Sequence, residues 1–366
     1  MRKAGPRIAI TSVLLIGLLI FLGVYYLWNT ATDIFQPASS AGTGKTVSIE
    51  ISPGETTAQI ANDLQSKHLI RNALAFRVWA RVKGLDTHLE AGIYKKLNSS
   101  MTISDIINQL LTAQPDAIRI IVLEGWRLEQ IAKQFANSNL SKFSEKNFLN
   151  YTKHIDQFPD ASRYPLLKSV PQGQGMEGLL FPSSYEIPVN ATATDVIDIM
   201  LKTMQDTISA NHLDTLAAQH NLSVYQLLTL ASIVEREAGS KNTPLERSEI
   251  ASVYWNRVYK PNNETVGLLD ADPTVQYARD TQNPPKTYWQ PLNDTGGNIA
   301  ANSPWNTYVN KGFPPSPICS PGLLSLQAAA SPANTDYYYF LTKKDGHAVF
   351  AKTGAEFQQE QQQYLQ

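Results

Sequence analysis

The stretch "LASIVEREAGS", residues 230–240, carries two glutamates at the polar end of an otherwise apolar run. Upstream, Ser223 and Gln226 have the spacing of a capping box, in which two side chains satisfy backbone N–H groups of the first helical turn. Gly239 is typical of a residue that ends a helix. We therefore predict a helix of about four turns over residues 224–238, with both glutamates in its last turn.

Helical periodicity does not choose between the two glutamates. At about 100° per residue, Glu235 and Glu237 lie about 160° apart, on opposite flanks of the apolar stripe. On composition alone, both are ordinary flank residues. Glu237 is nearer the C-terminus of the helix, where the helix dipole disfavours an anion. If a cleft shields Glu237 from water, desolvation favours its neutral form, which is the form that a general acid needs.

The N-terminus contains a run without charge, "IAITSVLLIGLLIFLGVYYLW", residues 8–28. A helix of about 20 apolar residues crosses a bilayer, so this run predicts a single transmembrane helix. Three basic residues precede it and the next one is Lys45, which predicts that residues 1–7 are cytoplasmic and the rest is exported. A cleaved signal peptide is the alternative, but the length of the run and its aromatic end favour a retained anchor.

Composition excludes several classes of function. The chain has 31 basic and 32 acidic side chains, so its charge gives no reason to propose nucleic acid as a partner. Cys319 is the only cysteine, which excludes an intrachain disulfide, and we expect it to be a packing residue rather than a nucleophile. The six histidines are scattered without the spacing of metal ligands. We therefore predict no metal and no cofactor.

Beyond a small polar linker at residues 29–45, we predict two α+β domains. Residues 46–115 form the smaller one, because strand patterns alternate there with short amphipathic helices. Residues 116–366 form the larger one, and they open with a strand–turn–helix at 118–135 that repeats the pattern of 46–64.

Within the larger domain we expect helices at about 193–210 and 244–258, in addition to the one at 224–238. Residues 259–330 are rich in Pro, Gly and Asn, and we expect a long loop region that forms a binding surface. The stretch "DYYYFLTKKDGHAVFAKT" predicts a β-hairpin that turns at residues 343–346, followed by a terminal helix.

Several segments resemble a known family. "LASIVEREAG", "RSEIASVYWNRV", "LLDADPTVQYA", "SPWNTYVNKGFPPSPICSPG", "EGLLFPSSYEI" and "VLEGWRLEQIA" resemble the YceG-like family of endolytic murein transglycosylases, also called MltG-type. Residues 51–61, "SPGETTAQIA" with the preceding isoleucine, resemble the opening of a LysM repeat, a fold associated with glycan binding. The chain departs from the family where Asp is usual, at Ser183, and where Tyr is common, at Trp305.

The family resemblance implies an α+β fold with one N-terminal transmembrane helix and a LysM-like subdomain. It also implies a lysozyme-like α+β catalytic domain with long loops and a C-terminal hairpin. The implied enzyme is a peptidoglycan lyase that cleaves the MurNAc–GlcNAc β-1,4 bond of nascent glycan strands, leaves 1,6-anhydroMurNAc ends and terminates strand elongation. The implied place is the bacterial inner membrane, as a single-pass protein of cell-wall biogenesis. The implied partners are the peptidoglycan synthases and the elongation and division machinery.

The resemblance assigns catalysis to the second glutamate of the pair, Glu237. A glycosidase usually needs two carboxylates, whereas a lytic transglycosylase can use one, because the sugar's own 6-hydroxyl replaces water. The residues that we consider for supporting roles, each with an ordinary capping, turn or packing role as the alternative, are Asp272, Glu235, Glu177, Asn256 and Arg257. The aromatic residues that could stack on sugars, or pack in the core instead, are Tyr277, Trp289, Trp305 and Tyr308.

Two other functions remain open at this point. A membrane-anchored scaffold without catalysis could bind peptidoglycan through the LysM-like module alone. A true hydrolase would need a second carboxylate beside Glu237, such as Glu235 or Asp272.

Overall fold

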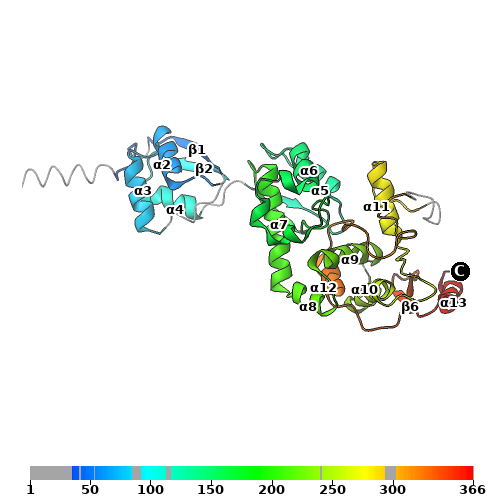
Figure 1. Cartoon of the computed structure of the whole chain (residues 1–366). Helices are drawn as coiled ribbons and strands as arrows, with labels where there is room; N and C mark the ends of the chain where they lie inside the picture. The colour runs from blue at the N-terminus through cyan, green and yellow to red at the C-terminus, as the bar shows by residue number, and fades with distance from the viewer. Residues whose placement is uncertain are drawn as a thin grey trace, which may run out of the picture. The chain divides into compact units, whose positions relative to one another are not determined.

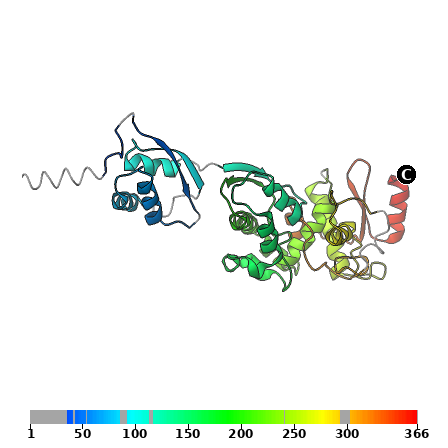
Figure 2. The same cartoon turned by 90° about the horizontal axis from the view of Figure 1, so that it is seen from above.

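The computed structural model describes residues 35–40, 43–52, 54–84, 92–112, 117–239, 241–292 and 302–365. The chain divides into two compact units: a first unit of residues 1–118 with 188–190, and a second unit of residues 119–187 with 191–366. This division lies close to the predicted boundary between 115 and 116. The α+β class is confirmed, since both units combine helices with small two-stranded sheets (Figures 1 and 2).

The predicted transmembrane segment, residues 8–28, lies outside the described residues. Among the helices that the structure does describe, none combines the length and apolar character that a bilayer crossing needs.

The first unit packs three helices against a two-stranded sheet. Its elements in chain order are β1 (Thr46–Ile51), α2 (Thr57–Ser66), α3 (Ala73–Val82), β2 (Gly92–Asn98) and α4 (Ile103–Thr112). β1 and β2 are antiparallel, and Ile49 lies opposite Tyr94. The predicted strand–turn–helix segments are present, and α3 is an additional helix that the sequence analysis did not identify.

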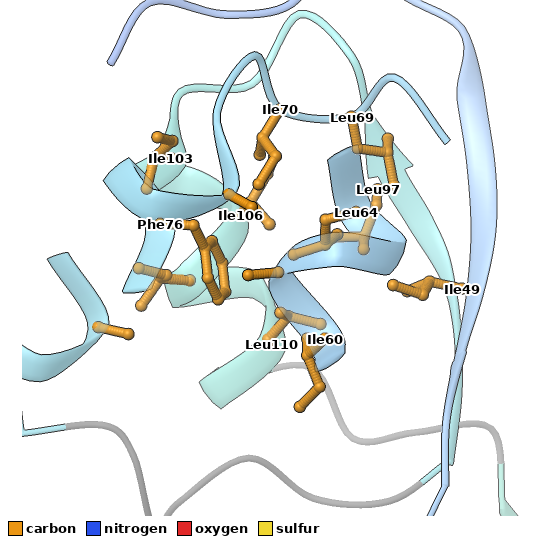
Figure 3. Packing of buried hydrophobic residues seen from close by; sticks show 14 of the residues in the cluster. Ile49, Ile60, Leu64, Leu69, Ile70, Phe76, Leu97, Ile103, Ile106 and Leu110 are labelled. Atoms are coloured by element: carbon orange, nitrogen blue, oxygen red, sulfur yellow. The ribbon is translucent and has the colours of Figure 1, made fainter. Parts of the chain in front are cut away.

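One apolar core holds the first unit together. Figure 3 shows Leu64 of α2, Phe76 of α3, Leu97 of β2 and Ile106 of α4 gathered in one cluster, and each of them is fully buried. α2 begins at a capping box in which Thr56 accepts a hydrogen bond from the Gln59 backbone N–H. The sequence therefore fixes where the helix starts, and burial of apolar side chains fixes how it packs.

The segment before β1 is attached to α3 and to the loop preceding it. The ring of Phe35 lies 6.0 Å from that of Trp79, and Pro37 forms a bridge with Ile70. The Arg71 Nε donates to the carbonyl oxygen of Pro37 at 2.8 Å. The chain therefore comes to the first unit alongside α3.

Most residues of the next strand pair belong to the second unit, and its ends fall in the first. β3 (Ala117–Ile121) pairs with β4 (Ser184–Pro188). Between them lie α5 (Leu128–Ala136), α6 (Glu145–Lys153) and three 3-10 turns at Ile155–Gln157, Ala161–Arg163 and Pro165–Ser169.

A helical body follows the strand pair. Its helices are α7 (Ala193–Ala210), α8 (Leu213–Gln219), α9 (Val224–Glu237), α10 (Pro244–Tyr259), α11 (Asp272–Gln282) and α12 (Leu323–Ala330). The helices that we predicted at 193–210, 224–238 and 244–258 are confirmed to within one residue at each end. α9 packs against α8, α10, α11 and α12, and Figure 1 shows α9, α10 and α12 together at the centre of the unit.

Two expectations about α9 are wrong. We expected one apolar face, but residues 227–234 are all buried, because neighbouring helices surround α9. We also expected Gly239 to end the helix. Instead α9 ends at Glu237 because Ala238 is already extended, with φ −73° and ψ 123°. The Gly239 N–H donates to the Asn242 side chain at 2.6 Å, which continues the chain toward α10.

The expectation of a long loop region over residues 259–330 is wrong in part, because α11 and α12 lie within it. Pro273 is the second residue of α11, where its missing N–H costs no helical hydrogen bond. α12 has the sequence "LLSLQAAA", which is apolar on nearly every side and therefore shows no amphipathic period.

The C-terminal hairpin and helix are confirmed. β5 (Tyr339–Thr342) and β6 (Ala348–Ala351) are antiparallel, and α13 (Gly354–Tyr364) packs on both strands. The ring of Phe357 in α13 stacks on Tyr339 of β5 at 5.4 Å.

α3 offers a matched test of the core of the first unit. Phe76→Ala should destabilise this unit by about 3–5 kcal/mol, because it removes a fully buried ring. Leu74→Ala in the same helix should change little, because Leu74 is 63% exposed. Hydrogen–deuterium exchange of the β1 and β2 peptides in the full chain measures both effects. Equal exchange in the two variants would contradict the described packing.

Candidate active site

Glu237 lies at the wall of a cavity of about 530 Å³ in the second unit. The lining residues come from the end of α9, from α10, from the start of α11 and from the C-terminal hairpin and helix. They are Glu237, Tyr254, Arg257, Leu269, Asp270, Asp272, Tyr308, Tyr339, Phe340, Leu341, Thr342, Phe357 and Gln361. Four of our sequence-predicted site residues therefore meet here: Glu237, Arg257, Asp272 and Tyr308.

The carboxyl group of Glu237 is held by a tyrosine from the next helix. The Tyr254 Oη donates to Glu237 Oε1 at 2.9 Å, and the Tyr254 ring meets Phe340 edge-on at 5.9 Å. The packing of α10 on α9 brings the phenol to this position. Tyr254 was not predicted, because no local pattern distinguishes it from the other aromatic residues of α10.

Burial raises the pKa of Glu237 to about 7. The negative charge of Asp272 raises this pKa further, whereas the Tyr254 hydrogen bond and the charges of Arg257 and Arg236 lower it. The carboxyl is densely surrounded by protein, yet the side chain keeps some exposed surface, so a ligand in the cavity can reach it. Near neutral pH this carboxyl therefore exchanges between its protonated and charged forms, whereas an ordinary glutamate is charged there.

Asp272 and Tyr308 form a hydrogen-bonded pair at the same cavity. The Tyr308 Oη donates to Asp272 Oδ1 at 2.7 Å. Asp272 is the first residue of α11, where the positive end of the helix dipole favours a carboxylate. The cavity thus contains a second carboxyl group beside Glu237, positioned by the start of α11 and by the hydrogen bond from Tyr308.

Arg257 brings a positive charge to the cavity wall and ties together three segments. Its Nη1 donates to the carbonyl oxygen of Leu269 at 2.6 Å and lies 3.2 Å from Asp270 Oδ2. Its Nε donates to the carbonyl oxygen of Tyr338 at 2.7 Å, just before β5. This arginine therefore fixes the hairpin against α10, which shapes the cavity.

The C-terminal hairpin and α13 supply a wall of apolar and polar side chains that the sequence analysis missed. Phe340 and Leu341 come from β5, and Phe357 and Gln361 come from α13. The aromatic run before the hairpin turn is the signal that could have pointed to this wall.

Glu235 lies away from the cavity. Its Oε2 accepts a hydrogen bond from the Gly322 N–H at 3.0 Å, at the start of α12. It is also close to Glu124, whose pKa is raised by burial and by the charge of Glu235. The two glutamates of the pair therefore have different partners. Glu235 accepts a hydrogen bond at the start of α12, whereas Glu237 faces the cavity.

Glu177 and Asn256 also lie away from the cavity lining. Glu177 is 5% exposed, and it accepts hydrogen bonds from the Leu128 N–H and the Tyr277 Oη. Burial raises the pKa of Glu177 to about 8. Asn256 donates to the carbonyl oxygens of Thr335 and Tyr337, which fixes the chain before the hairpin.

Three aromatic residues that we considered for sugar stacking pack elsewhere. Tyr277 is 8% exposed and its ring lies 5.8 Å from Trp305. The Trp305 Nε1 donates to the Ser316 hydroxyl at 2.9 Å, and the Trp289 ring stacks on Arg236. None of the three lines the cavity at Glu237, whereas Tyr308 does. Cys319 is buried, as expected of a packing residue.

The described part of the chain contains no group of three or more His, Cys, Asp or Glu side chains arranged to hold a metal ion. Proton transfer by Glu237, with Asp272 and Arg257 as nearby charges, is the chemistry that this cavity can support.

Comparison with known proteins identifies the family. The sequence model of the YceG-like family matches residues 49–363. This chain belongs to the YceG-like family. It is 33% identical over 332 residues to the endolytic murein transglycosylase of Bacillus subtilis (strain 168), covering 87% of this chain and 85% of that protein. The resemblance found in the sequence is thereby confirmed.

Two further proteins are similar to this chain over most of its length. The chain is 28% identical over 362 residues to the endolytic murein transglycosylase of Streptococcus pneumoniae serotype 2, covering 91% of this chain but 60% of that protein. The 2.6 Å crystal structure of a yceG-like protein from Listeria monocytogenes matches with a TM-score of 0.56 and 28% identity, covering 87% of this chain and 100% of that chain.

Tyr254→Phe tests the hydrogen bond to Glu237. The phenol stabilises the charged carboxylate, so its loss should raise the midpoint of the Glu237 titration by about one pH unit from its value near 7. Carboxyl-carbon NMR measures this midpoint, with Glu237→Gln to assign the signal. Tyr259→Phe, in the same helix, is the control and should leave the midpoint unchanged. A Tyr254→Phe midpoint at or below that of the unaltered chain would refute the described contact.

Proposed function

We propose that this chain is an endolytic murein transglycosylase, a lyase that cuts peptidoglycan strands. The curated relatives carry that name, and the match to the Bacillus protein extends over most of both chains. The observation that carries the proposal is a single carboxyl group, Glu237, with a pKa of about 7 at the wall of an open cavity. Such a group can both give and take a proton near neutral pH.

In the proposed first step, Glu237 protonates the glycosidic oxygen that leaves C1 of N-acetylmuramic acid. The C1–O bond breaks, and its electron pair stays on the leaving oxygen. In the second step, the 6-hydroxyl of the same sugar bonds to C1 and gives its proton to the Glu237 carboxylate. A 1,6-anhydro ring results and Glu237 is again protonated, so no water is consumed. Because the attacking hydroxyl belongs to the same sugar, proximity supplies much of the rate advantage.

The neighbours of Glu237 have proposed roles that follow from their charges. The Asp272 carboxylate helps to keep the proton on Glu237 and can stabilise positive charge that develops at C1. Tyr308 holds Asp272 in place, and Tyr254 does the same for Glu237. Arg257 positions the cavity wall through its contacts to backbone carbonyl groups. Glu235 and Glu177 have no proposed part in catalysis, because each has partners elsewhere.

We propose further that residues 8–28 anchor the enzyme in the bacterial inner membrane, with the catalytic unit outside the cytoplasm. The support is the uncharged length of this run and the basic residues before it. An anchored lyase would stay within reach of newly made strands. The synthases and the elongation and division machinery are therefore the proposed partners, and termination of strand elongation is the proposed outcome.

The proposal that the first unit is LysM-like rests on the resemblance of residues 51–61. In the sequence, a Pro-Gly pair comes shortly before Thr56, the capping residue of α2. Under this proposal the first unit would hold glycan while the second unit cuts it.

Mass spectrometry of murein digested by the full chain in detergent distinguishes the three candidate functions. Anhydro-muropeptides are expected from a lytic transglycosylase. Reducing termini would identify a hydrolase, with Asp272 as the carboxylate near enough to assist. The absence of products would favour a scaffold that binds without cutting.

Glu237→Gln should lower the yield of anhydro ends at least about a hundredfold, because the amide cannot exchange the proton. Glu235→Gln is the matched control two residues earlier, and it should retain most activity, since Glu235 contacts α12 rather than the cavity. Equal losses of activity in the two variants would mean that Glu237 has no special role.

The unaltered enzyme should lose activity as the pH rises above about 7, where Glu237 gives up its proton.

A further inference from the structure

α3 of the first unit has an exposed apolar face in addition to its buried one. Its inward face contributes Phe76 to the core. On the outside, Leu74 is 63% exposed, Val78 48% and Val82 70%. These three residues are spaced by four, so they form one continuous stripe along the helix. Exposed apolar side chains grouped in this way are typical of a surface that binds another protein, a membrane or a ligand.

Positive charge flanks this stripe. Arg77 and Arg81 line the same surface pocket of about 420 Å³ as Leu74 and Val78. The sequence of α3, "ALAFRVWARV", contains no acidic residue. Next to the helix end, Lys83 Nζ lies 5.6 Å from the Trp79 ring. Apolar, aromatic and basic side chains on one short helix are the combination by which helices lie on anionic lipid surfaces.

The chain path places α3 close to the predicted membrane span. Phe35 packs against Trp79, and Pro37 is held by Arg71 at the start of the helix. Only residues 29–34 separate Phe35 from Trp28, the end of the uncharged run. That connection reaches at most about 25 Å when fully extended. A helix attached to the chain at this point cannot be far from the bilayer in which residues 8–28 would sit.

We propose that the stripe of Leu74, Val78 and Val82, with Arg77 and Arg81, docks on the phospholipid surface of the membrane that holds the anchor. The apolar side chains enter the headgroup boundary, and the guanidinium groups meet anionic lipid phosphates. This inference rests on the proposed anchor and is independent of the proposed catalysis. A lipid surface fits better than a glycan, because exposed aliphatic side chains offer a sugar few hydrogen bonds.

The test uses the full chain in nanodiscs of phosphatidylcholine and phosphatidylglycerol. A fluorophore is attached at Val78→Cys or, as the control on β2, at Lys96→Cys, and spin-labelled lipids are the quencher. The native Cys319 is buried, so the unsubstituted chain serves as the labelling blank. We expect quenching at Val78→Cys several times that at Lys96→Cys. Replacing phosphatidylglycerol with phosphatidylcholine, or adding Arg77→Gln, should reduce the difference in quenching between the two labelled positions.

The possible outcomes test the docking surface on α3 separately from the transmembrane anchor at residues 8–28. Incorporation into nanodiscs with equally weak quenching at both positions would refute the docking surface and leave the anchor intact. Failure to incorporate, seen by size-exclusion chromatography, would remove the anchor and the docking surface together. A Val78→Cys signal that responds to added chitooligosaccharide but not to the lipid quencher would identify a glycan-binding face instead. If the face binds lipid, anhydro-muropeptide release from soluble glycan should be the same in Arg77→Gln as in the unaltered chain.

Discussion

The burial of α9 constrains the whole second unit. Packing on every side of residues 227–234 holds the helix rigidly, and its last residue, Glu237, then emerges at the wall of a cavity. A carboxylate in that position loses much of its hydration, and the helix dipole gives it no compensation. The Tyr254 phenol compensates only in part, so the protonated form persists at neutral pH. Apolar packing thus creates the chemical property on which the proposed reaction depends.

At the end of α9, the two glutamate side chains, Glu235 and Glu237, lie in different environments. Glu235 satisfies the Gly322 N–H at the beginning of α12, so it contributes to assembly of the helical body. Glu237, on the other flank, contacts Tyr254 and is influenced by Asp272. The carboxylate that accompanies Glu237 in the cavity is therefore Asp272, held by Tyr308, and not its neighbour in sequence, Glu235.

Local signals in the sequence predicted local structure well. The capping box of Ser223 and Gln226 is present, and the hairpin turns where its Lys-Asp-Gly sequence indicates. Contacts between distant segments could not be predicted, because residue spacing along one helix does not reveal which neighbouring element packs on each of its flanks. That limit explains why Tyr254 and the α13 wall were missed. It also explains why Tyr277, buried in the core, was considered for sugar stacking.

α13 has a practical consequence for anyone who produces this protein. Phe357 and Gln361 belong to the wall that faces Glu237, and Tyr364 ends the helix directly afterwards. An affinity tag or reporter fused directly after α13 would therefore start within a few residues of the cavity lining, where it would compete with a long polymer for room. Purification handles are better inserted into a surface turn remote from this helix, so that comparisons of turnover are made on an unobstructed cleft.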